Sequence, residues 1–129
     1  MKRCLGIAAI FALVLAAALT ASAQTRVKFG PGRTSAILTG KLSNYQQKRV
    51  FLVHVRSGQT MAIRDIGRYA VSIWVEGPPG SDYVQDLAAD CHGRTDISPT
   101  AAGDYKLTIQ ECQKVDRWRG TFRVRVSVH

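Results

Sequence analysis

Apolar and polar residues alternate with a period of two in several separate segments of this chain, as they do in half-buried β-strands. The last such segment, 120–128, is the clearest, because its apolar residues fall on one face and its polar residues on the other. The segments 50–56, 69–76 and 103–111 alternate in the same way, and 34–42 is a further candidate strand. No stretch after Gln24 has the 3.6-residue period of an amphipathic helix.

Seven or eight short strands, separated by turn residues, predict an all-β chain that folds as a single antiparallel, jelly-roll-like β-sandwich. The turn at 57–59 and the connection 114–119 are each interpreted as hairpins between successive strands. The segment 81–99 is the least regular and is expected to hold loops and one or two short strands. The residues predicted to form the core are Leu52, Val71, Ile73, Tyr105, Leu107, Ile109, Phe122, Val124 and Val126.

The first 23 residues have the three parts of a secretory signal peptide. Lys2 and Arg3 precede an apolar run, and the small residues at 21–23 supply a cleavage site before Gln24. The apolar run is shorter than the ~20 residues that a membrane-spanning helix needs. We therefore expect a helical signal peptide at 1–23, a short N-terminal segment at 24–32 and the sandwich domain at 33–129. The mature protein would be periplasmic or secreted, with no membrane span.

The chain is basic, with 18 Lys and Arg against 9 Asp and Glu. Removal of 1–23 takes away two of the basic residues and leaves a net charge of +7. A basic surface favours anionic partners, such as an acidic protein cleft or an anionic glycan, although it also serves simply to keep a protein soluble. We do not expect nucleic acid to be the partner.

Only two cysteines, Cys91 and Cys112, remain in the mature part. In an exported protein they are expected to form one disulfide. A zinc site would need about four closely spaced ligands, and only His92 lies near either cysteine. The acidic residues between 82 and 96 lack the spacing of a calcium loop. The sequence therefore predicts no metal site and no cofactor.

No motif of a known catalytic site is present: the chain has no Gly-x-Ser-x-Gly, no His-Glu-x-x-His and no glycine-rich phosphate loop. His54 lies in the middle of a predicted strand, where a position at the edge of the core is the simpler interpretation. These observations favour a binding protein over an enzyme.

Basic side chains gather near the C-terminus. Arg117 and Arg119 flank Trp118 at the tip of the predicted last hairpin, and Arg123 and Arg125 share one face of the following strand. Exposed Trp and Arg are enriched at binding hot spots. The alternative is that Trp118 packs back onto the sheet and the arginines are ordinary solvated charges.

Three short motifs resemble the pre-peptidase C-terminal (PPC-like) β-sandwich domains: 55–61 with its Ser-Gly-Gln-Thr turn, 102–107 with Gly-Asp-Tyr-Lys-Leu, and 120–124 at the start of the last strand. A small exported family with the same architecture is the periplasmic inhibitors of goose-type lysozyme. The order and spacing are similar over most of the chain, from 34 to 128. The two cysteines and Trp118 are not features of this resemblance.

The resemblance implies a non-catalytic inhibitor that presents basic hairpin residues to the acidic active-site cleft of a lysozyme. An arginine on a rigid hairpin can pair with a carboxylate through its fork of N–H donors. On this interpretation Arg117, Trp118 and Arg119 are anchors, and Tyr45 is a further member of the contact. Arg123 and Arg125 would only steer an acidic partner. The alternative function is that of a glycan- or envelope-binding accessory module.

Overall fold

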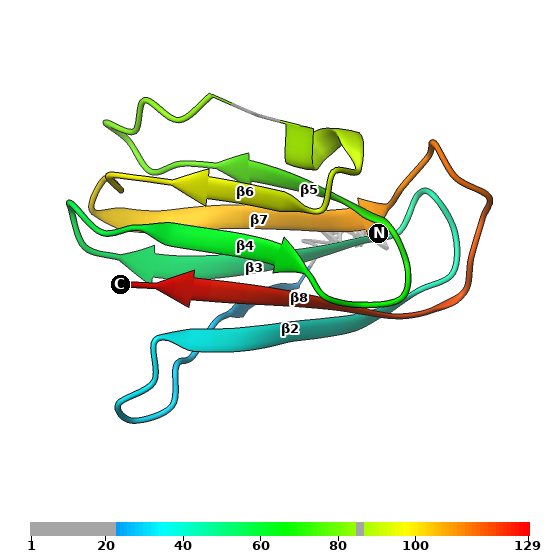
Figure 1. Ribbon diagram of the computed structural model, residues 1–129, viewed down its shortest axis with the longest axis horizontal. Helices are drawn as coiled ribbons and strands as arrows, with labels where there is room; N and C mark the ends of the chain where they lie inside the picture. Colours follow the sequence, from blue (N-terminus) through cyan, green and yellow to red (C-terminus); the bar gives the residue numbers. More distant parts are fainter. Residues whose placement is uncertain (1–22, 85–86) are drawn as a thin grey trace, which may run out of the picture.

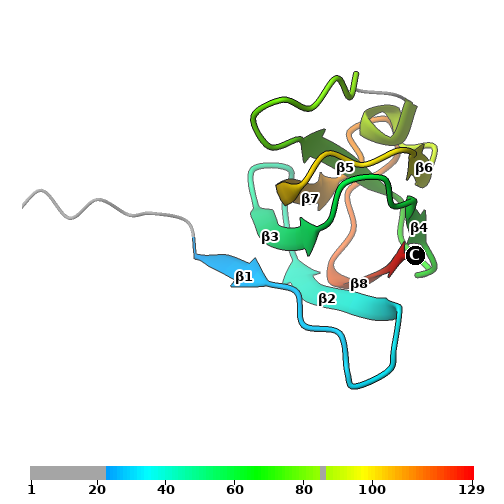
Figure 2. The same ribbon diagram turned by 90° about the vertical axis from the view of Figure 1, so that its left-hand side faces the viewer.

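The computed structural model describes residues 23–84 and 87–129, which form two four-stranded sheets packed face to face (Figures 1 and 2). The first sheet has the order β1-β3-β7-β5 and the second the order β2-β8-β4-β6. The strands are β1 (Gln24–Arg26), β2 (Ser35–Leu42), β3 (Lys48–Val55), β4 (Met61–Asp65), β5 (Val71–Glu76), β6 (Arg94–Ile97), β7 (Gly103–Glu111) and β8 (Gly120–Val128). The predicted all-β sandwich is confirmed, and the predicted signal peptide lies outside the described residues except for Ala23.

Successive strands alternate between the two sheets along the whole described chain. The strand β7 pairs with β3 and β5, whereas β8 pairs with β2 and β4. The predicted hairpins at 57–59 and 114–119 are therefore wrong, because both segments cross from one sheet to the other. A short polar connection has the same composition whether its flanking strands pair or lie in opposite layers.

The segment 24–32 contributes a strand that the pattern did not predict. The strand β1 runs parallel to β3, and both nitrogens at the tip of Arg26 donate to the Asp104 carboxylate at 2.9 Å. The Nδ1 atom of His54 lies 3.0 Å from the same carboxylate. Hydrogen bonds from Arg26 and then His54 hold the pKa of Asp104 far below its usual range. The three residues of β1 are polar and exposed, so they show no alternation in the sequence. The strand is recognised only from its pairing with β3 and from the contacts of Arg26.

The core lies between the sheets and is built from the inward face of each strand. Eight of the nine predicted core residues are buried. The ninth, Leu52, lies on the outer face of β3 beside β1 and is only partly buried. Phe51 and Phe122 meet edge to face across the layers, with ring centroids 6.2 Å apart, which is a favoured geometry for aromatic pairs.

The predicted disulfide is present. Cys91 bonds Cys112 and so ties the irregular segment to the end of β7. This segment holds a 3-10 helix, η1 (Leu87–Asp90), and the short strand β6. Closure of a loop of about 20 residues removes conformations from the unfolded chain, a stabilisation of roughly 3 kcal/mol on the chain-entropy description. In the described part of the chain, no helix is both long and apolar enough to span a membrane.

Candidate functional site

Three connections meet at one end of the sandwich, on the right in Figure 1. They are residues 43–47 between β2 and β3, 66–70 between β4 and β5, and 112–119 between β7 and β8. We call this surface the loop end. It brings together four of the residues predicted to bind a partner, namely Tyr45, Arg117, Trp118 and Arg119.

Trp118 forms the base of the loop end. Its ring stacks on that of Tyr69, with centroids 4.5 Å apart and planes inclined by 8°. The indole Nε1 donates to the carbonyl oxygen of Ala70 at 3.1 Å, and the side chain packs against the hydrophobic core. The side chain is half-buried and turned toward the sheet, which agrees with the alternative that Trp118 packs back onto the sheet. Its role as a binding anchor stays a prediction.

The stack depends on the absence of a side chain at Gly120. A Cβ atom placed there would collide with the ring of Tyr69. Because Gly120 begins β8 directly after the loop, the glycine lets the Tyr69 ring lie against the backbone beneath the stack. The guanidinium of Arg68 lies 5.6 Å from the centroid of the Tyr69 ring, a distance that suits a cation–π contact.

A buried glutamate at the end of β7 holds the 112–119 loop in place. Glu111 is fully buried, and its Oε1 accepts a hydrogen bond of 2.6 Å from the backbone N–H of Trp118. Its Oε2 has no hydrogen-bond partner among the described residues. Hydrogen bonds to a carboxylate are stronger than those between neutral groups. Glu111 therefore fixes the backbone of the loop at the residue between the two arginines.

A second contact ties the 112–119 loop to the 43–47 turn. The hydroxyl of Tyr45 donates to the carbonyl oxygen of Val115 at 2.8 Å, and the guanidinium of Arg117 lies 5.1 Å from the centroid of the Tyr45 ring. The turn itself is held by Asn44, whose Oδ1 accepts from the backbone N–H groups of Gln46 and Gln47. Both loops are thus ordered by contacts that leave Arg117 and Arg119 exposed.

A depression at the loop end is lined by residues of two connections, namely Ser43, Asn44, Arg117, Trp118 and Arg119. Its lining includes the guanidinium groups of two arginines together with the amide of Asn44 and the hydroxyl of Ser43. The arrangement can bind a carboxylate or another planar anion through the fork of N–H donors on each arginine.

The disulfide supports the opposite flank of the same loop. The N–H of Cys112 donates to the carbonyl oxygen of Ala70 at 3.2 Å, and Lys114 pairs with Asp90 at the end of η1. The hydrogen bond from Lys114 lowers the pKa of Asp90. Both contacts restrain the start of the loop.

The remaining predicted residues, Arg123 and Arg125, do not belong to the loop end. They lie on the outer face of β8, in the second sheet. Within the described ranges 23–84 and 87–129, no three His, Cys, Asp or Glu side chains gather as a group that could hold a metal ion.

Sequence reasoning missed Glu111 and gave Tyr69 no role at the loop end. The signal for Glu111 was present, because it continues the inward series Tyr105, Leu107 and Ile109 on β7. An acidic residue at a core position is rarely buried without a partner. The sequence therefore indicates that Glu111 has a buried partner, but it does not identify that partner as the backbone N–H of Trp118.

The protein is thus an all-β sandwich whose loop end carries two exposed arginines on an ordered loop. Solved structures of the same fold include the periplasmic inhibitor of g-type lysozyme (PliG) from Aeromonas hydrophila, which is 23% identical with a TM-score of 0.59, over 82% of this chain and 96% of that one. The Salmonella Typhimurium PliG is 18% identical with a TM-score of 0.62, over 82% and 97%.

A pre-peptidase C-terminal domain of a Bacillus anthracis collagenase is also similar, with 12% identity and a TM-score of 0.48, over 83% of this chain and 95% of that domain. No family model matches the chain, and no curated protein sequence matches it. The two PliG structures confirm the predicted resemblance to the periplasmic inhibitors of goose-type lysozyme at the level of the fold.

Proposed function

We propose that the mature chain is an exported, non-catalytic protein that inhibits a lysozyme, and that it contacts the enzyme through the loop end. The observation that carries this proposal is that the loop holds Arg117 and Arg119 in fixed positions. Both are exposed, while the residue between them is fixed by the Tyr69 stack and by Glu111. The PliG proteins with the same fold are periplasmic inhibitors of g-type lysozyme, which supports a periplasmic location and a lysozyme as the partner.

The physical basis of inhibition would be charge pairing on a preorganised surface. A lysozyme cleft holds a catalytic glutamate, and an arginine that enters the cleft can form two parallel hydrogen bonds with a carboxylate. Because the loop is already ordered in the free protein, few side chains lose freedom on binding. The bound loop end would then occupy the space that the glycan substrate needs.

The proposal predicts selective inhibition in a cell-wall lysis assay. Purified protein is added to goose-type, chicken-type and invertebrate-type lysozymes, and the rate of lysis is measured at increasing inhibitor concentration. We expect stoichiometric inhibition of the goose-type enzyme, because the fold is that of inhibitors of this class. Lack of inhibition of all three enzymes would contradict the proposal and favour a glycan- or envelope-binding module.

A further inference from the structure

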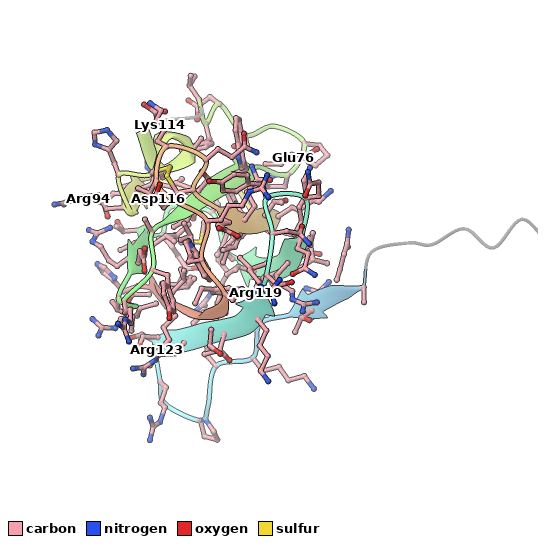
Figure 3. The ribbon with its side chains drawn as sticks, turned by 90° about the vertical axis from the view of Figure 1, so that its right-hand side faces the viewer. Glu76, Arg94, Lys114, Asp116, Arg119 and Arg123 are labelled. Carbon is pink, nitrogen blue, oxygen red and sulfur yellow. A yellow bond between two sulfur atoms is a disulfide. The ribbon has the colours of Figure 1, made fainter. Side chains whose placement is uncertain are left out.

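The outer face of the second sheet carries a concentration of arginines that the loop end does not use. The side chains that alternate outward from β4, β6 and β8 include Arg64, Arg94, Arg123 and Arg125. On β2 the outward residues include Ile37 and Lys41. Figure 3 shows Arg94 and Arg123 on the same side of the molecule, opposite Glu76 on the outer face of the first sheet. We call this surface the basic face.

The strand register places three of the arginines in one row. Arg125 lies opposite Arg64 on β4, and Arg64 lies opposite Arg94 on β6. Because neighbouring strands are about 4.8 Å apart, the row spans about 10 Å across three strands. Like charges directly opposite each other destabilise a sheet. On a sheet face without a ligand, this row of like charges only lowers stability. On a face that binds anions, the same row supplies the positive charge that the ligand needs.

One acidic side chain partly offsets the row. Asp96 accepts from Arg64 at 2.7 Å and lies 3.9 Å from Arg94. The guanidinium of Arg64 also donates to the carbonyl oxygens of Ile63 and Thr95. Arg64 is thus held by its own strand and by the neighbouring strand β6. Arg123 and Arg125 have no ion pair with any of the described residues and are free to meet an external anion.

An exposed apolar residue ends the row. Ile37 lies opposite Arg125 on the other side of β8, and 48% of its surface is exposed. A flat cationic surface with an apolar residue at its edge suits the headgroup region of a membrane, where guanidinium groups meet phosphates and short apolar side chains enter the acyl boundary. A soluble anion offers no place for Ile37.

We propose that the basic face binds an anionic lipid surface through its phosphate headgroups. Binding of this kind would hold the protein against an envelope membrane while the loop end, formed by connections at one end of the sandwich, stays open to a partner. The inference does not depend on the lysozyme proposal, because it is drawn from a different surface and concerns a different ligand.

Sedimentation with vesicles tests the inference. Purified protein is mixed with vesicles of phosphatidylcholine alone or of phosphatidylcholine with phosphatidylglycerol, at physiological ionic strength. We expect binding only to the anionic vesicles. Each basic residue close to an anionic membrane contributes about fivefold in affinity. The triple variant Arg94→Gln, Arg123→Gln, Arg125→Gln should therefore bind at least tenfold more weakly.

The matched control removes the same charge from the loop end, as Lys114→Gln, Arg117→Gln, Arg119→Gln. This variant should keep most of the vesicle binding. An equal loss in both triple variants would overturn the proposal, because it would show that net charge alone is responsible. So would binding to soluble heparin with no binding to anionic vesicles, which would assign the basic face to a polymeric anion. No lysozyme is present, so failure here is separate from failure of the proposed function.

Discussion

Replacement of Val124 by aspartate is expected to unfold the domain. Val124 is fully buried on β8, and its apolar burial contributes about 1.5–3 kcal/mol. The new carboxylate would be buried opposite Asp65, whose pKa is already raised by burial. A buried charge without a partner costs several kcal/mol more, and small domains have only about 5–15 kcal/mol in total. Circular dichroism at 25 °C should show loss of the β-sheet spectrum.

The matched control is Thr121→Asp on the same strand. Thr121 is exposed and lies opposite Lys41, so this aspartate keeps its hydration and gains a cationic neighbour. Its melting temperature should stay near that of the wild type. A wild-type melting temperature for Val124→Asp would mean that the strand register is wrong.

Truncation of Trp118 to alanine is expected to lower the free energy of unfolding by about 2–3 kcal/mol, as the loss of a partly buried aromatic residue typically does. The change removes the stack on Tyr69 and the hydrogen bond to Ala70. The loop then keeps its contacts with Glu111, Tyr45 and Asp90 and its backbone hydrogen bond to Ala70, but loses its packing against the core. Chemical denaturation monitored by circular dichroism measures the difference.

Trp74 provides the comparison, since it is the other tryptophan of the chain and 46% of its surface is exposed on β5. Trp74→Ala should change stability by less than about 0.5 kcal/mol, as surface substitutions usually do. Trp118→Phe should recover part of the loss because a ring can still stack. Equal effects of the two alanine substitutions would contradict the supporting role assigned to Trp118.

The inward faces of the strands were predictable from the sequence because burial of one face imposes a period of two. On β8, for example, the buried series Phe122, Val124 and Val126 is interrupted only by exposed residues. The layer to which each strand belongs was not predictable in this way. Alternation indicates that a strand has an inner face and says nothing about which strands lie beside it. For this reason the sequence wrongly predicts a hairpin at 114–119.

The candidate site was predictable in part for the same reason. The cluster of Arg117, Trp118 and Arg119 is visible in the sequence, which also predicts Tyr45 as a further member. The structure shows how Tyr45 reaches this loop, through a hydrogen bond to the Val115 carbonyl oxygen. The inward position of Trp118 depends on its stack with Tyr69 and on the hydrogen bond from its backbone to Glu111. These two partners are distant in sequence from each other, so the local pattern does not show them. The row on the basic face likewise needs the register of three strands, which places Arg64, Arg94 and Arg125 side by side.

The measurement that tests the central claim most directly is inhibition of goose-type lysozyme by two charge-matched double variants. One carries Arg117→Ala and Arg119→Ala at the loop end, and the other carries Arg123→Ala and Arg125→Ala on the basic face. Loss of central anchors typically costs about 2 kcal/mol or more, whereas loss of peripheral charges mainly alters the association rate and its salt dependence. The inhibition constant of the loop-end variant should therefore rise at least tenfold and that of the basic-face variant far less. The reverse ranking in folded proteins, or no inhibition by the wild type, would contradict the assignment of the loop end as the lysozyme-binding surface.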